Sequence, residues 1–173
     1  MADFAYAIAK VLANEGAYEA PSPLDPGGET YCGVSRRFWP NWPGWAIIDT
    51  YKGQESFPKN LAAAPGLDDM VKSFYLKNFW HFDGIVDRDV AEKLLDLWVN
   101  LPPDRAAKVI QAAARGLGEQ VVLDGSYGPA TETALNRCSP TTLLLELRAQ
   151  QAYHYATTAK PQLLLGLLRR AVK

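Results

Sequence analysis

The sequence predicts a mainly α-helical protein with one irregular, loop-rich segment in its first half. Apolar residues recur at helical spacing along most of the chain, whereas prolines, glycines and aromatic residues are concentrated in residues 18–65. Of the 173 residues, 48% are hydrophobic and 21% are charged, a composition typical of a globular domain that can bury a core.

The first predicted helix covers residues 3–15 and ends in a carboxylate. Phe4, Ile8 and Val11 repeat on one helix face, and the next position on that face is Glu15. A glycine follows at once, where helices commonly stop. Burial and the negative end of the helix dipole both favour the protonated form of such a carboxylate, as a general acid requires. The alternative is that the helix frays and Glu15 points into water.

Residues 18–65 follow as ordered loops with short helices or a small hairpin. Two more carboxylates, Asp25 and Glu29, lie here on either side of a Pro-Gly-Gly turn. The turn can fold the loop back toward the end of the first helix. Alternatively, Asp25 caps the turn with its own side chain and Glu29 is a solvated loop carboxylate.

The rest of the chain is predicted to be helical. Asp89 and Glu92 resemble a capping box, and the helix that they open is apolar on most of its surface, so we expect it to be central. No strong linker divides the chain, and we expect one compact globule. The predicted helices cover residues 67–80, 89–100 and 104–115, a short stretch from Pro129, residues 140–158 and a leucine-rich segment after Pro161.

Composition and residue counts exclude several classes of function. A net charge of −1 and a pI near 6.1 provide no basic surface for nucleic acid. Cys32 and Cys138 are expected to be reduced and structural, and neither they nor the two histidines have metal-ligand spacing, so no metal or cofactor is expected. No standard secretory signal and no membrane-spanning apolar run are evident, so we expect synthesis in the cytoplasm.

Two segments resemble a known family. Residues 15–18 (Glu-Gly-Ala-Tyr) and 25–35 (Asp-Pro-Gly-Gly-Glu-Thr-Tyr-Cys-Gly-Val-Ser) resemble the N-terminal signature of glycoside hydrolase family 108, the N-acetylmuramidases found as phage endolysins and secretion activators. Residues 40–45 look like the aromatic segment of one branch of it. Residues 124–131, with Ala134 and Leu135, are similar to the peptidoglycan-binding module that accompanies these enzymes.

The resemblance implies a lysozyme-like helical domain, with a muramidase catalytic region in residues 1–100 and a helical peptidoglycan-binding-like region in residues 101–173. It implies that Glu15 is the acid that cleaves the β-1,4 bond between N-acetylmuramic acid and N-acetylglucosamine in peptidoglycan. Asp25 and Glu29 are then the candidates for activating a water molecule. We further expect a monomer that reaches the periplasm or cell wall through a holin or dedicated export.

Aromatic residues near these carboxylates are candidate sugar-binding residues, since flat aromatic rings can stack on the apolar faces of sugars. The predicted substrate-binding residues are Tyr18, Tyr31, Trp42 and Trp45. Two departures from the family pattern are Ala17, where a second glycine is usual, and Cys32. A lytic transglycosylase acting on the same bond and a non-catalytic peptidoglycan-binding protein remain alternatives.

Overall fold

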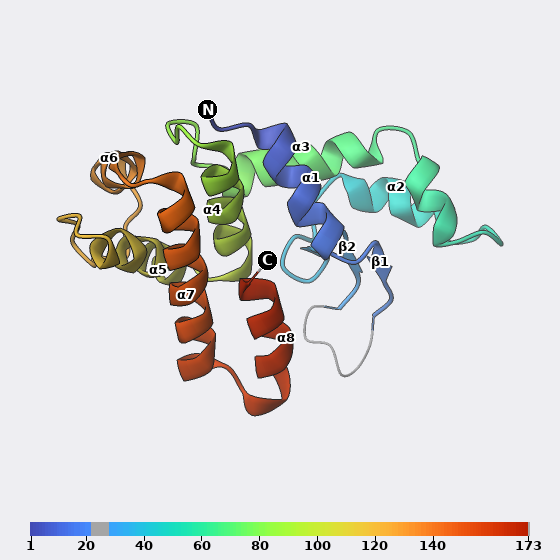
Figure 1. Ribbon diagram of the computed structural model, residues 1–173. Coiled ribbons are helices and arrows are strands. Elements are labelled where there is room, and N and C mark those ends of the chain that lie inside the picture. Colours follow the sequence, from blue (N-terminus) through green and yellow to red (C-terminus); the bar gives the residue numbers. More distant parts are fainter. Residues whose placement is uncertain (22–27, 173) are drawn as a thin grey trace. The chain divides into compact units, whose positions relative to one another are not determined.

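The computed structural model describes residues 1–21 and 28–172 (Figure 1). The described residues are mainly helical and carry one small three-stranded sheet, which confirms the predicted fold class. None of the helices in these residues is long and apolar enough to cross a membrane. The elements are α1 (Phe4–Asn14), β1 (Tyr18–Glu19), β2 (Thr30–Tyr31), β3 (Val34–Ser35), α2 (Gly44–Tyr51), the 3-10 helix η1 (Lys59–Ala63), α3 (Leu67–Phe79), α4 (Arg88–Asn100), α5 (Pro103–Gly116), α6 (Pro129–Arg137), α7 (Pro140–Thr158) and α8 (Pro161–Ala171).

The chain forms two compact units. The first, residues Ile8–Trp80, contains most of α1, the sheet, α2, η1 and α3. The second combines Met1–Ala7 with His81–Lys173 and contains α4 to α8. We call them the loop-rich unit and the helical unit.

The loop-rich unit has the small sheet that the proline- and glycine-rich sequence favoured. Its strands pair antiparallel in the order β1-β2-β3, with Tyr18 opposite Tyr31 and Thr30 opposite Ser35. The apolar stripe of α1 is buried as predicted, because Ile8 and Val11 are 1% and 0% exposed. The helix ends at Asn14, so Glu15 lies directly after its last turn.

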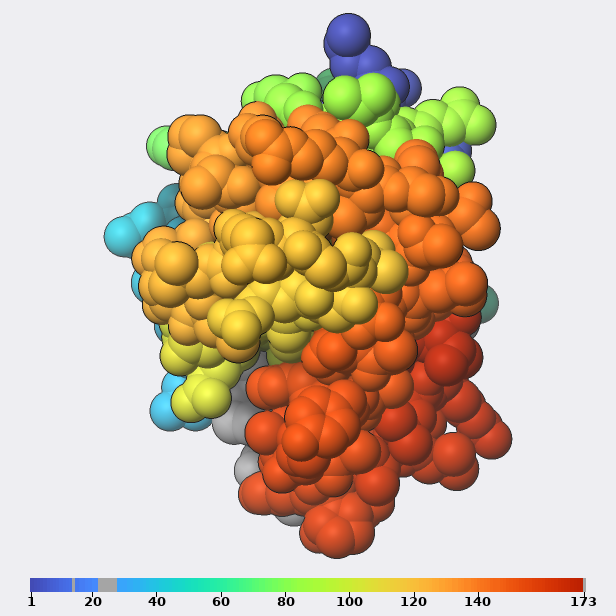
Figure 2. Space-filling model, turned by 60° about the vertical axis from the view of Figure 1, so that its left-hand side comes forward, coloured from blue at the N-terminus to red at the C-terminus, as the bar shows by residue number. Residues whose placement is uncertain are grey.

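The helical unit is built around α4 and α7. Leu94, Leu95 and Leu97 of α4 are fully buried, as the apolar pattern of this helix predicted. Helix α7 packs on α4, α5 and α8. Figure 2 views the face of this unit on which α6, α7 and the connection preceding α6 lie.

The predicted capping box at Asp89 is wrong by two residues. Helix α4 begins at Arg88, and the carboxylate of Asp87 caps it by accepting hydrogen bonds from the main-chain N–H groups of Asp89 and Val90, both at 3.0 Å. Asp89 instead accepts a hydrogen bond from the hydroxyl of Tyr6. The sequence pattern permitted either aspartate as the cap, and tertiary contacts decided between them.

A buried polar cluster joins α8 to α4 and α7. The ammonium group of Lys93 donates to the main-chain carbonyl of Ala171 at 3.2 Å and lies 3.4 Å from the carboxylate of Asp96. Arg170 binds the same carboxylate at 3.1 Å, and the side-chain amide of Gln151 lies 3.4 Å from it. Burial lowers the pKa of Lys93, and the charge of Asp96 opposes that effect. These contacts hold α8 through charge and hydrogen bonding.

Candidate active site

Glu15 lies half-buried against the turn that joins β2 to β3. A Cβ atom added to Gly33 would lie 3.0 Å from Oε2 of Glu15 and 3.3 Å from its carboxyl carbon. The carboxylate therefore packs on the bare main chain of this glycine. Such a position removes part of its solvent shell while leaving the group accessible, as proton transfer to a substrate requires.

The turn itself depends on left-handed main-chain conformations. Cys32 has φ of 45° and Gly33 has φ of 79°. The hydroxyl of Tyr75, from α3, donates to the carbonyl of Cys32 at 2.9 Å, and Tyr75 is 1% exposed. A Cβ at Gly33 would overlap this same hydroxyl. Only glycine at position 33 allows both the Tyr75 phenol and the Glu15 carboxylate to approach the main chain so closely.

The two departures from the family pattern differ in consequence. Within residues 1–21 and 28–172, Cys32 is the only non-glycine residue with positive φ, so Ala17 adopts its conformation without that strain. The main chains of the two residues meet, since the N–H group of Cys32 donates to the carbonyl of Ala17 at 2.7 Å. Alanine is therefore compatible with the local backbone, and Cys32 carries the unusual conformation.

Asp68, at the start of α3, is a second carboxylate near Cys32. Burial raises the pKa of the Cys32 thiol, and the negative charges of Asp68 and Glu15 raise it further against a hydrogen bond from Tyr31. Burial is the main cause that raises the pKa of Tyr31 to about 12, and the charges of Cys32 and Asp68 add to it. Two carboxylates from segments that are distant in sequence thus both raise the pKa of the same thiol. Nothing in the sequence distinguished Asp68, because its pairing with Lys72 four residues later is typical of an exposed helix face.

Glu29 has a different environment. It is 8% exposed and accepts from Arg36 at 2.9 Å, Lys52 at 2.8 Å and the Tyr18 hydroxyl at 3.1 Å. Burial acts to raise the pKa of Glu29, but hydrogen bonds from Lys52, Arg36 and Tyr18 outweigh it, so the pKa is lowered. Arg36 and Lys52 also bind Asp49, at 2.6 and 2.7 Å. This network ties the sheet to α2.

The predicted catalytic residue Asp25 lies outside the described residues. The structure therefore gives geometry for Glu15 and Glu29, the other two predicted carboxylates. Of these, Glu29 is bound by two cations, whereas Glu15 lies against a glycine and beside a buried phenol.

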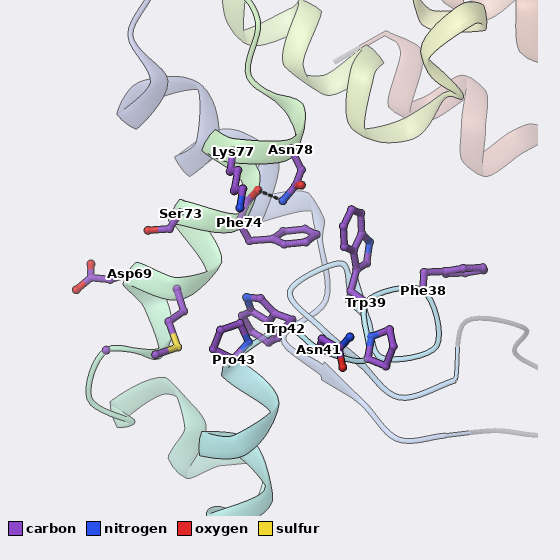
Figure 3. A pocket seen from close by; sticks show the side chains of 13 residues that line it. Phe38, Trp39, Asn41, Trp42, Pro43, Asp69, Ser73, Phe74, Lys77 and Asn78 are labelled. Carbon is purple, nitrogen blue, oxygen red and sulfur yellow. Dashed lines mark hydrogen bonds between the residues drawn. The ribbon is translucent and has the colours of Figure 1, made fainter.

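Three of the four predicted sugar-binding aromatics are buried. Tyr31, Trp42 and Trp45 are 7%, 8% and 2% exposed. The rings of Tyr31 and Trp42 stack with centroids 6.4 Å apart, and the indole N–H of Trp45 donates to the carbonyl of Trp39 at 2.8 Å. Tyr18 is half-buried, with its hydroxyl engaged by Glu29. These rings chiefly build the unit, and of the four only Trp42 lines the cavity in Figure 3.

That cavity has a volume of about 680 Å³ and lies between α3 and the segment that precedes α2 (Figure 3). Trp39, which is 39% exposed, meets the ring of Phe74 edge to face at 4.9 Å. The side-chain amide of Asn78 donates to the carbonyl of Phe74 at 2.7 Å, and Lys77 adds a cation. An apolar wall with a few polar groups suits the face of a sugar ring.

The cavity and the Glu15 turn share two structural supports. Phe74 and Tyr75 are neighbours on α3, and Phe74 lines the cavity while Tyr75 holds the turn. The stacked pair of Tyr31 and Trp42 similarly joins the residue before Cys32 to the cavity wall. Nothing in the sequence distinguished Tyr75, because a tyrosine in the apolar stripe of a helix is typical of a core residue.

Comparisons with known proteins agree with this fold. The sequence pattern of the family described as glycosyl hydrolase 108 matches residues 8–101, more than half of the chain. The solved structure of SagA from Brucella abortus is similar with a TM-score of 0.60 and 22% identity, over 98% of this chain and 93% of that one. No curated protein sequence matches. The chain therefore belongs to glycoside hydrolase family 108 and is a lysozyme-like glycosidase that hydrolyses peptidoglycan.

Proposed function

We propose that the protein is an N-acetylmuramidase that hydrolyses the β-1,4 bond between N-acetylmuramic acid and N-acetylglucosamine, with Glu15 as its general acid. The observation that carries this proposal is the half-buried Glu15 carboxylate, packed on Gly33 directly after a helix end. The carboxyl group is partly enclosed and still open to a substrate, as proton transfer requires. A carboxyl group in such a place can donate its proton to a glycosidic oxygen.

In this mechanism the bond between the sugar and the departing oxygen breaks as Glu15 transfers its proton to that oxygen. Positive charge builds on the ring that is left, and a water molecule attacks it. A second carboxylate stabilises that charge or takes a proton from the water. Glu29 is a weak base for this role, since Arg36 and Lys52 already bind it.

Among the described carboxylates, Asp68 is the better candidate for the second role. It acts electrostatically on Tyr31 and Cys32, and Glu15 acts on the same Cys32 thiol. Its side chain is 70% exposed, so water can reach it. Asp25 remains a further candidate.

We propose that the cavity beside Trp39 and Trp42 binds part of the glycan. Trp39 is partly exposed and held at a fixed angle against Phe74, so it offers a preformed apolar face. Binding to this cavity would hold the glycan so that its glycosidic bond lies next to Glu15.

The first test replaces Glu15 by glutamine, which preserves size and removes the transferable proton. Release of soluble fragments from purified sacculi should fall by about 100- to 10,000-fold, while the thermal midpoint stays near that of the parent protein. Glu19→Gln, an exposed neighbour in β1, is the matched control and should remain active. A fully active Glu15→Gln variant would remove Glu15 from the mechanism.

Mass spectrometry of the released muropeptides tests the bond and the reaction. Hydrolysis at the proposed bond gives N-acetylmuramic acid at the reducing end. Anhydro ends would instead identify a lytic transglycosylase, in which a hydroxyl group of the sugar replaces water as the attacking group.

The second test replaces Asp68 by asparagine. If Asp68 activates water, the turnover number should fall by about tenfold or more. Lys72→Gln is the control, because it breaks the ion pair with Asp68 and leaves the carboxylate in place. Equal activity of Asp68→Asn and the parent would exclude Asp68 from this role, and Asp25→Asn would then be the variant to measure.

A further inference from the structure

The helical unit contains a second cavity, of about 410 Å³, that the proposed catalytic residues do not use. Its side-chain walls come from three separate segments. His81 precedes α4, Trp98 lies in α4, Tyr127 precedes α6 and Glu132 lies in the first turn of α6. Gly125, Gly128 and two prolines complete the lining and leave the space open.

The aromatic walls of this cavity stand at steep angles to one another. The ring of Trp98 meets His81 at 5.5 Å with an interplanar angle of 73°, and Tyr127 at 5.8 Å and 71°. Phe82 supports both Trp98 and Tyr127 edge to face, at 5.8 and 5.2 Å. The rings of His81, Trp98 and Tyr127 thus wall one side of the cavity with aromatic surface.

Two polar groups of this cavity have no hydrogen-bond partner within the part of the chain that the structure describes. The hydroxyl of Tyr127 is buried without a hydrogen bond. In residues 1–21 and 28–172, no hydrogen bond or ion pair reaches the carboxylate of Glu132, which packs on the main chain of Gly84. Burial is the larger cause that raises the pKa of Tyr127, and the negative charge of Glu132 raises it further. A buried hydroxyl group without a partner costs folding free energy, whereas the half-buried carboxylate of Glu132 offers a negative charge to a ligand.

A ligand group that satisfies these features must be compact, positively charged and rich in N–H donors. An alkylammonium group can lie among aromatic faces through cation–π attraction and donate to the carboxylate of Glu132. Its attached carbon chain can contact the rings of Trp98 and His81. The aromatic walls and the acid thus favour the same chemistry.

We propose that this cavity binds the side-chain ammonium group of a diamino acid in the peptide stems of peptidoglycan. The choice of peptidoglycan as the source rests on the proposed function, since wall peptides then surround the enzyme as it works. A stem peptide bound here would hold the enzyme on the bacterial cell wall. The loop-rich unit, which contains Glu15, would act on the glycan.

The test is calorimetric titration of the whole chain with a soluble stem peptide that ends in a diamino acid. The probe contains no glycosidic bond, so its binding is independent of whether Glu15 is catalytic. We expect the free-amine peptide to bind and the same peptide with its side-chain amine acetylated to bind about tenfold or more weakly. Glu132→Gln, which preserves shape, should weaken binding of the free-amine peptide by a similar factor.

Glu119→Gln is the matched control. Glu119 lies in the same unit, 3.6 Å from Arg137, and does not line this cavity, so this variant should bind the free-amine peptide as the parent does. Equal binding of the amine and acetylated peptides, or unchanged binding in Glu132→Gln, would overturn the proposal. Binding of lysine-containing peptides in general, with no preference for stem peptides, would overturn the assignment to the wall.

Discussion

Glu15 and Glu29 are two carboxylates of the same unit, fourteen positions apart, in different surroundings. Glu29 is the more buried of the two, and its carboxylate accepts hydrogen bonds from two cations and a phenol. Glu15 is half-buried, and a glycine main chain lies against its carboxyl group. The difference teaches that the more buried of two carboxylates can serve the fold. It predicts that Glu15, and not Glu29, transfers the proton.

The largest effect on stability is expected from Gly33→Ala, at the Glu15 site. The added Cβ would overlap the Tyr75 hydroxyl, crowd the Glu15 carboxylate and force alanine into φ of 79°. We expect a loss of about 2–4 kcal/mol in the free energy of unfolding and at least about tenfold lower activity. Urea unfolding and sacculus hydrolysis measure the two effects.

A double variant refines this prediction. Tyr75→Phe removes the hydroxyl that the new methyl group would overlap, so Gly33→Ala should cost less in that background than in the parent. Additive losses in the double-mutant cycle would show that the overlap with Tyr75 is not the source of the defect.

Glu29→Gln is expected to have a smaller effect, and mainly on stability. The variant keeps the shape of the side chain but leaves Arg36 and Lys52 with Asp49 as their remaining partner. We expect the free energy of unfolding to fall by about 1–2 kcal/mol, with the activity of the folded protein nearly unchanged. A catalytic loss as severe as that of Glu15→Gln, at unchanged stability, would contradict this comparison and make Glu29 a catalytic residue.

The smallest predicted effect is on the pH dependence of stability. The pKa of Glu29 in the folded protein is lowered from its ordinary value of 4.5, so its ion pairs stabilise the fold fully above that pH and are lost as the pH falls below it. Hydrogen bonds from Arg36 and Lys52 also lower the pKa of Asp49, which acts in the same direction. Urea midpoints at neutral pH and near pH 3.5 should therefore differ less in Glu29→Gln than in the parent.

The sequence predicted the helices well because prolines, caps and apolar stripes are local signals. The ends of α3, α5 and α7 fell within one residue of the predicted positions. The choice of Glu15 as the acid, made because a charged residue interrupted an apolar stripe, stays a prediction. Gly33, Tyr75 and Asp68 escaped sequence analysis, because their significance depends on which segments meet at the β2–β3 turn. No spacing along the chain encodes that meeting.

The buried cluster of Lys93, Asp96 and Arg170 determines the docking register of α8. A shift of α8 along its axis would separate Lys93 from the carbonyl of Ala171 and Arg170 from Asp96. The enclosed ammonium would then keep only Asp96 as an acceptor. Leucines by themselves tolerate such sliding, and Leu163 and Leu165 are 59% and 61% exposed. Exchanging those two leucines for polar residues should thus be a mild way to improve solubility, whereas shortening the chain before Ala171 would unseat the helix.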